Sequence, residues 1–166
     1  MDGQLNPTAT KQRPSASPII KPKTKMAMIK LMAGKLHRAR VTNANVDYIG
    51  SIAIDSDLLH AAGILPMQEV EVVNISNGNR WSTYALPGTP SSGEICPNGG
   101  GALLCEPGDI LIIFSYTYVD PAELDIKEHR GITLLLDSEN VCTSILEQKL
   151  TRTDGQLRYG CDEYPP

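Results

Sequence analysis

The chain has 166 residues and a mass of 18.0 kDa, and 41% of its residues are hydrophobic, which is enough to bury the core of one domain. Its net charge of -4 and its isoelectric point near 5.3 exclude a general nucleic-acid binder, which would carry a basic patch. No apolar run approaches the ~18 residues that cross a bilayer, and the first residues lack the apolar segment of a secretory signal. We therefore expect a cytoplasmic protein with no membrane and no nucleic-acid partner.

The first 25 residues form a proline-rich, mildly basic segment. They contain four prolines and five Lys or Arg residues against the single acid Asp2. Such a composition offers little to bury, so we predict a disordered extension over residues 1–25. A transit peptide is the alternative, because acidic residues are scarce, although most of the basic residues are lysine.

Short strands and one helix are predicted after this segment. Asp55 or Ser56 can cap a short helix, and Gly63 is well placed to end it. Runs of apolar and β-branched residues between turn signals predict the strands. The strand candidates are residues 29–31, 35–41, 52–54, 70–76, 79–86, 110–119 and 132–136.

Asn77-Gly78 is the strongest short hairpin signal in the chain, and it lies between two of these strand candidates. A chain so rich in strands closes into a barrel or a sandwich, and periodicity does not choose between them. Residues 151–166 are polar and end in two prolines. We predict that they form a loosely attached, flexible C-terminal tail.

Gly50-Ser51 is the dipeptide with the most specific chemistry. A serine directly after a glycine can attack the preceding carbonyl with its own hydroxyl, since the glycine has no side chain to block the approach. The ester that forms is less stable than the amide, so local strain or oxyanion donors must favour it. The chain would then be cut between these two residues. The ordinary alternative is a tight turn or a bulge within a hairpin.

Seven groups of residues follow one another in a fixed order along the chain. They are Gly34-Lys35-Leu36-His37-Arg38, Val41-Thr42 with Tyr48-Ile49-Gly50-Ser51, Ala61-Ala62-Gly63-Ile64-Leu65, Asn77-Gly78-Asn79-Arg80, Ser82-Thr83-Tyr84-Ala85, Asn98-Gly99, and Pro107-Gly108-Asp109. In content and spacing this series closely resembles the pyruvoyl-dependent L-aspartate α-decarboxylases over residues 28–150. Seven phrases in order rarely match by chance, so the resemblance is specific.

The resemblance implies a mainly β fold with short helices, a six-stranded double-psi β-barrel over residues 26–150. It implies a homotetramer with active sites between subunits, and a helper protein for maturation is left open. Cleavage between residues 50 and 51, followed by elimination and loss of ammonia, would leave a covalent pyruvoyl cofactor derived from Ser51. Its ketone would condense with the amine of L-aspartate and accept the electrons released as CO2 leaves. The product would be β-alanine for pantothenate and coenzyme A.

The same resemblance assigns roles on the strand 79–86. Thr83 matches a threonine of processing and substrate binding, and Tyr84 matches the proton donor, for which a phenol is chemically adequate. Arg80 can hold a substrate carboxylate bidentately, and Lys35 supplies a second charge. His37 lies two residues after Lys35 and so shares its strand face. Thr83 does not share the parity of Arg80 and Tyr84, so the strand bulges there or Thr83 serves a different subunit or stage.

Two further segments match residues that line the pyruvoyl pocket of the family. Tyr48 precedes the cut by two residues, and Asn98 and Gly99 form a family phrase. The chain continues with Gly100 and Gly101, where relatives commonly carry alanines. This departure is expected to loosen the backbone beside the cofactor and puts substrate fit in doubt.

The four cysteines show no zinc spacing, so we predict no metal and interpret them as buried, reduced thiols. Two other functions stay open. One keeps the mechanism but acts on glutamate or another acidic amino acid. The other is a barrel that never cleaves and serves as a binding module.

Overall fold

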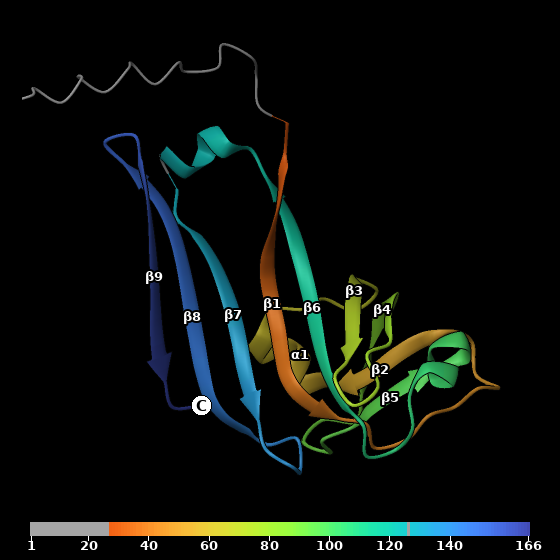
Figure 1. The fold of residues 1–166 in the computed structure, drawn as a ribbon. Coiled ribbons are helices and arrows are strands. Elements are labelled where there is room, and N and C mark those ends of the chain that lie inside the picture. Colours follow the sequence, from red (N-terminus) through yellow and green to blue (C-terminus); the bar gives the residue numbers. More distant parts are fainter. Residues whose placement is uncertain (1–26, 126) are drawn as a thin grey trace, which may run out of the picture.

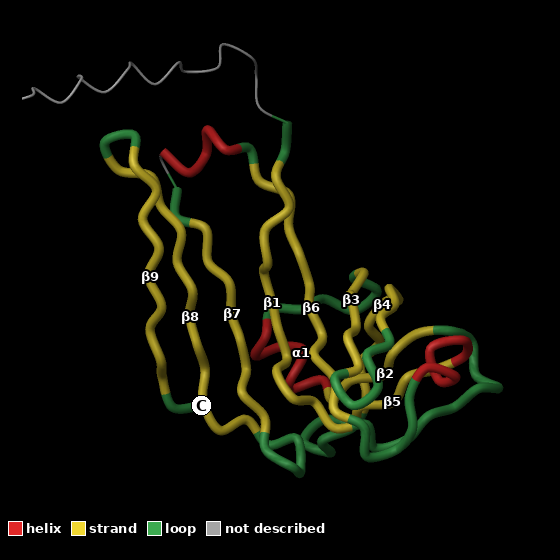
Figure 2. Tube along the Cα trace, in the orientation of Figure 1, coloured by secondary structure: helices red, strands yellow, loops and turns green. Residues whose placement is uncertain are grey.

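The computed structural model describes residues 27–125 and 127–166, and it is mainly β (Figure 1, Figure 2). The extension predicted over residues 1–25 lies outside the described residues. None of the helices in the described part of the chain is long and apolar enough to cross a membrane. The elements in chain order are β1 (Ile29–Arg40), β2 (Ser51–Asp55), α1 (Ser56–Ala62), β3 (Glu69–Asn74), β4 (Arg80–Gly88), β5 (Ile95–Asn98), η1 (Gly99–Leu104), β6 (Ile110–Val119), η2 (Pro121–Asp125), β7 (His129–Leu136), β8 (Cys142–Thr153) and β9 (Gln156–Tyr164).

The strands form one sheet in the order β5-β2-β4-β3-β6-β1-β7-β8-β9. Two neighbouring pairs, β1 with β7 and β2 with β4, are parallel, and the other pairs are antiparallel. Figure 1 shows β7, β8 and β9 beside β1, on the side opposite to β3 and β4. The long strands β1 and β6 therefore connect the small strands around α1 with the C-terminal strands.

Strand β1 is continuous, whereas the sequence predicted two separate strands here. Two β-bulges interrupt its pairing with β6. The register with β6 shifts between Met32 and Gly34 and again between His37 and Ala39. Arg38, inside the second shift, has a φ of 69°. The extra residue lets both Leu36 and Ala39 face the core, although they are three residues apart, and both are 0% exposed.

The predicted helix and hairpin are both confirmed. The Asp55 side chain accepts a hydrogen bond from the Asp57 N–H at 2.8 Å and caps α1, and Gly63 ends the helix with a φ of 67°. Strands β3 and β4 pair on either side of the turn that contains Gly78, which has a φ of 84°. The sequence therefore placed these elements correctly, with end points a few residues from those observed.

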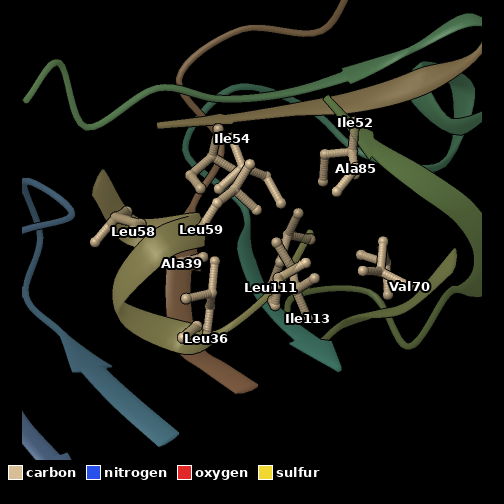
Figure 3. Packing of buried hydrophobic residues seen from close by; sticks show 14 of the residues in the cluster. Leu36, Ala39, Ile52, Ile54, Leu58, Leu59, Val70, Ala85, Leu111 and Ile113 are labelled. Carbon is tan, nitrogen blue, oxygen red and sulfur yellow. The ribbon is translucent and has the colours of Figure 1, made fainter. Parts of the chain in front are cut away.

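The core lies between α1 and the inner faces of the strands (Figure 3). Ile52 and Ile54 of β2, Leu36 of β1 and Leu111 and Ile113 of β6 are all 0% exposed. Alternation along β3 and β6 sends every second residue into this cluster and the others to the opposite face. Positions adjacent to core residues are therefore fixed on the opposite side of the sheet.

The predicted flexible C-terminal tail is wrong for most of its length. Residues 156–164 form β9, which pairs along its whole length with β8. Every residue of β9 is exposed, so no hydrophobic alternation marked it as a strand in the sequence. Backbone pairing and polar contacts hold it instead, including a 2.6 Å hydrogen bond from Ser144 Oγ to Glu163 Oε1 and a 2.8 Å ion pair between Lys149 Nζ and Asp162 Oδ2.

The strand pairing is that of a nine-stranded sheet with two ends, β5 and β9, and not of six closed strands. The segment that follows β1 nevertheless bonds to the outer edge of β5. The Thr42 N–H donates to the Ile95 carbonyl at 2.9 Å, and the Asn45 N–H donates to the Pro97 carbonyl at 3.0 Å. Asn45 also forms a parallel bridge with Asn98. The edge of β5 is thus covered by the chain itself.

Candidate active site

Ser51 is buried at the start of β2. It is 1% exposed, because the fully buried Ile52 anchors the strand and β5 lies alongside. Antiparallel pairing places Asn98 opposite Ser51, and Asn98 Nδ2 donates a 2.9 Å hydrogen bond to Ser51 Oγ. The hydroxyl is therefore held in one orientation by a neutral donor, and it keeps its own proton for donation or removal.

Gly50, on the other side of the bond, is exposed and packs against the turn after β5. Gly99 has a φ of 58°, and a Cβ there would lie 2.9 Å from Gly50 Cα and 3.2 Å from the Tyr48 carbonyl oxygen. The Gly99 N–H donates to the Asn45 carbonyl at 2.8 Å. Only glycine fits this position, so the turn and the Gly50-Ser51 peptide are held in close contact.

A second contact orients the Asn98 amide. Cys96 Sγ lies 3.6 Å from Asn98 Oδ1, and both residues are buried. Burial raises the pKa of the Cys96 thiol, and Glu94 adds to the effect, so the thiol stays protonated and can donate. A donor on Oδ1 requires that Nδ2 is the atom facing Ser51.

The prediction of buried, reduced cysteines is correct for some of them. All four are free, and Cys96 and Cys105 are buried. Burial raises the pKa of Cys105 to about 11. Cys142 is half-buried and Cys161 lies exposed on β9, where the absence of a hydrophobic pattern concealed the strand.

The two unusual glycines after Gly99 have different surroundings. A Cβ on Gly100 would meet nothing within 4 Å, whereas a Cβ on Gly101 would lie 2.9 Å from Trp81 Nε1. This indole nitrogen is buried and has no hydrogen-bond partner among the described residues. The indole of Trp81 therefore occupies the space that a methyl group on residue 101 would need, whereas a methyl group on residue 100 has open space around it.

The β3–β4 hairpin anchors the far end of the same turn. The Leu104 carbonyl accepts hydrogen bonds from three asparagine side chains, at 3.2 Å from Asn74, 3.1 Å from Asn77 and 3.0 Å from Asn79. Asn74 also donates to Asp109 Oδ2 at 2.7 Å. The Asn-Gly phrase that predicted the hairpin thus also fixes η1 relative to β4.

The side chains that point away from the core on β1, β6, β3 and β4 form a continuous surface, which we call the outer face. Strand pairing arranges it in two rows. The rows are Lys35, Phe114, Glu71 and Ser82, and His37, Ile112, Val73 and Arg80. Lys35, His37 and Arg80 were predicted to bind substrate. The structure places all three on this one surface, although Arg80 is distant from the other two in the sequence.

Lys35 and Arg80, two of the cations on the outer face, both contact residues on the middle strands of that face. Lys35 Nζ lies 5.3 Å from the centre of the Phe114 ring on the neighbouring strand β6. The Arg80 guanidinium forms an ion pair with Glu71 on the neighbouring strand β3. Both charges thus lie over the middle two strands of the face, where a dianionic ligand could meet them.

His37 is neutral near pH 7. Partial burial lowers its pKa from 6.5, and the positive charges of Lys35 and Arg38 lower it further. Its Nδ1 is buried without a hydrogen-bond partner among the described residues. Buried polar atoms without a hydrogen-bond partner are uncommon in proteins, so this nitrogen is available to a ligand or to water.

Thr83 and Tyr84 lie on opposite faces of β4. The pairing with β3 runs without a register shift from Glu69 opposite Tyr84 to Val73 opposite Arg80, so β4 does not bulge here. Thr83 shares the inward side with the buried Ala85, whereas Tyr84 is 36% exposed. Ala85 pairs with Ile52, so Tyr84 and Ser51 occupy corresponding positions on the parallel strands β4 and β2. Of the two explanations for the parity of Thr83, the bulge is wrong.

The described chain thus contains two groups of candidate residues, one around the Gly50-Ser51 bond and one on the outer face. Arg80 and Tyr84 are four residues apart on β4, or roughly 13 Å at ~3.3 Å per residue. Lys35 is on β1, four positions from β2 when the sheet order is counted through β4, β3 and β6, although the segment after β1 also bonds to β5 beside β2. The sequence missed Glu71 and Tyr116, which contact Arg80 or its partner, although strand alternation could have placed both on this face.

These features define a mainly β protein with a buried serine at a strand start and a cationic strand face. The family model described as "Aspartate decarboxylase" matches residues 26–143. The protein named Aspartate 1-decarboxylase of Microcystis aeruginosa is 55% identical over 132 residues, which cover 79% of this chain and 94% of the relative. The proteins of the same name from Synechocystis sp. and Bacillus velezensis are 50% and 46% identical and cover 78% and 74% of this chain, and 90% and 95% of the relatives. The chain therefore belongs to the aspartate decarboxylase family, as its phrases predicted.

Proposed function

We propose that this protein cleaves itself between Gly50 and Ser51 and then decarboxylates L-aspartate to β-alanine and CO2, a step in pantothenate and coenzyme A synthesis. The observation that carries the proposal is the hydrogen bond from Asn98 to the buried Ser51 hydroxyl at the edge of an exposed glycine. The relatives that share about half of its residues are named for this reaction.

The surroundings of Ser51 fit a covalent pyruvoyl group at this position. Asn98 supplies a buried N–H donor, and the close contact of Gly99 with Gly50 leaves no side chain between the turn and the bond to be cut. A pyruvoyl ketone supplies an electron sink for the charge that decarboxylation leaves on carbon. Asn98 and Gly99 would hold this group, and the buried setting would keep water from it.

The remaining residues bind substrate and move a proton. Arg80 and Lys35 bind the two carboxylates of aspartate, and His37, neutral at pH 7, offers a hydrogen bond without a third positive charge. The Tyr84 phenol donates the proton that replaces CO2, since it occupies the same position on β4 as Ser51 on β2. Thr83, on the inner side of β4, acts during cleavage. Tyr48, Gly100 and Gly101 line the pocket beside the cut.

The separation of the two groups supports assembly of the site from two protomers. Arg80 lies four residues, or roughly 13 Å along the strand, from Tyr84 beside Ser51, and we infer that a substrate held by Arg80 of one chain reacts at the Ser51 of another. A homotetramer in which the outer face of one protomer covers the Ser51 region of the next brings both groups to one ligand. Half-exposed apolar residues such as Phe114, Ile112 and Val73 would be buried in that contact.

The contacts at β5 support the six-stranded double-psi barrel. Strands β5, β2, β4, β3, β6 and β1 follow one another in the sheet, and the segment after β1 bonds back to β5 through Thr42 and Asn45. In the proposed barrel, these bonds would close the ring around the core. Strands β7, β8 and β9 then form an extension beyond β1. The cytoplasmic location and the need for a maturation partner stay predictions.

An intact-mass measurement on denatured protein tests the proposal. We expect two fragments, split after Gly50, with the larger one trapping a carbonyl-reactive reagent. The Ser51→Ala protein should stay one chain, trap no reagent and release no CO2 from aspartate. Full activity of this variant would sink the proposal, and a higher kcat/KM for glutamate than for aspartate would change the substrate.

A further inference from the structure

The Arg80 guanidinium is held from one side by its own chain. Arg80 Nε forms an ion pair with Glu71 Oε1, although 59% of the Arg80 side chain is exposed. A guanidinium carries five N–H donors, which is more than one carboxylate oxygen can accept. Glu71 therefore fixes the direction of the guanidinium and leaves donors for a second carboxylate.

Glu71 is itself fixed by neighbours on the outer face. Its second oxygen, Oε2, accepts a 2.8 Å hydrogen bond from the Tyr116 hydroxyl. Lys30 Nζ lies 4.1 Å from the centre of the Tyr116 ring and holds that ring in place by a cation–π contact. The hydrogen bond from Arg80, and then that from Tyr116, lowers the pKa of Glu71, so the carboxylate is ionised at neutral pH.

This chain of contacts differs from an ordinary surface ion pair. An isolated exposed pair contributes little, because both long side chains lose conformational freedom when they meet. Here the conformation of the Glu71 side chain is already restricted, because Glu71 lies on a strand between β4 and β6 and accepts a hydrogen bond from Tyr116. The cost of ordering Arg80 is met before substrate arrives, which favours substrate binding.

We propose that Glu71, supported by Tyr116, is a positioning residue that pre-orders Arg80 for a substrate carboxylate and so sets KM. This inference rests on the proposed role of Arg80 as a substrate ligand. It assigns to Glu71 no contact with the reacting atoms. Glu71 should therefore change substrate affinity without changing self-cleavage or the rate of the bound substrate.

The test is a comparison of Glu71→Ala with the wild-type protein. We expect the KM for aspartate to rise about fivefold to tenfold, since ordering one long side chain costs about that factor, while kcat stays within about twofold. Glu71→Gln, which keeps an acceptor for Arg80 Nε, should restore most of the affinity. Tyr116→Phe, which removes only the hydroxyl, should raise KM by about twofold.

Glu128→Ala is the matched control. Glu128, just before β7, pairs with Arg130 at the start of β7, whose side chain is also 59% exposed, and neither residue belongs to the two candidate groups. The KM of Glu128→Ala for aspartate should equal that of the wild type. Binding of succinate to the mature protein by calorimetry repeats the comparison without turnover and covers a variant whose activity is too low to measure.

The outcomes separate the two proposals. An unchanged KM and succinate affinity in Glu71→Ala, in an active and cleaved protein, would overturn the role of Glu71 alone. A fall in kcat with KM unchanged would overturn it as well. A wild-type protein that cleaves but releases no CO2 from aspartate would overturn the proposed function, and with it the basis of this inference.

Discussion

The region around Ser51 and the outer face are built in opposite ways. Ser51 is 1% exposed, and its hydroxyl already has a donor from its own chain, Asn98. Arg80 has a side chain that is 59% exposed, and the buried Nδ1 of His37 has no partner among the described residues. The hydroxyl of the first region is buried and hydrogen-bonded within the chain, whereas the second region presents an exposed guanidinium and a buried imidazole nitrogen that no described residue contacts by a hydrogen bond.

Because of this difference, the proposed chain cleavage would need one protomer, whereas the proposed turnover of substrate would need two. Cleavage needs Ser51, Gly50 and the residues that hold them, all of which one chain brings together. In the proposed function, turnover also needs the outer face, which we assign to a neighbouring protomer. Variants in the first region should therefore alter both stages, whereas variants on the outer face should alter turnover alone.

The largest effect is expected at Ser51. Ser51→Ala removes the attacking hydroxyl, so both cleavage and aspartate decarboxylation should be lost entirely. Denaturing gel electrophoresis and a CO2-release assay measure the two losses. Thermal stability should fall modestly, because the buried Asn98 Nδ2 loses its acceptor at a cost of about 1–3 kcal/mol.

Arg80→Ala is expected to separate the stages. Loss of a charge-assisted contact worth ~1.5–3 kcal/mol should lower kcat/KM by about 10-fold to 100-fold. The rate of chain cleavage should stay that of the wild type. Arg130→Ala, at an equally exposed arginine on β7, is the control for loss of a surface charge. A cleavage defect in Arg80→Ala alone would contradict the division.

Gly99→Ala should slow cleavage by about tenfold, since an alanine at a φ of 58° is strained by roughly 1–2 kcal/mol and its Cβ would lie 2.9 Å from Gly50 Cα. The measurement is the time course of fragment appearance after synthesis. Gly160→Ala is the matched control, because a Cβ there meets nothing within 4 Å. Equal rates in the two variants would show that close contact of this turn is not needed.

The smallest effect concerns His37 and pH. Its pKa is lowered in the folded chain, so the unfolded chain binds a proton more readily. This term therefore favours unfolding as the pH falls below about 6.5 and is absent above it. Urea unfolding from about pH 7.5 to about pH 5.5 should show a smaller loss of stability in His37→Gln than in the wild type. A larger loss of stability in His37→Gln than in the wild type would contradict the predicted direction of the effect.

Local patterns predicted most of the strands up to β7 but not β8 and β9. The segment 110–119 is a run of apolar and aromatic residues that follows a turn signal, and β6 has those bounds. The segment 156–164 has no buried residue, so its pairing with β8 comes from backbone hydrogen bonds that a sequence pattern does not display. Strand β5 is short and contains Pro97, which argued against a strand.

The candidate site was predictable as a set of residues and not as an arrangement. The resemblance named Lys35, Arg80 and Ser51, but their grouping depends on which strands become neighbours. Alternation along a strand predicted that Thr83 and Tyr84 face opposite sides of the sheet. The regular pairing of β4 with β3 then excluded a bulge between them. Glu71 escaped notice because an exposed acid on a strand has no motif. Its meaning comes from its contacts with Arg80 and Tyr116.

The most direct test of the two-protomer site is complementation between two inactive proteins. Ser51→Ala keeps its outer face, and Arg80→Ala keeps its cleavage site. When the two are co-expressed in equal amounts, a head-to-tail arrangement should give about one quarter of the sites an intact group from each chain. We predict recovery of activity to about that fraction, far above either variant alone. If activity stays at the level of Arg80→Ala, the outer face and Ser51 act within one chain, and the account is contradicted.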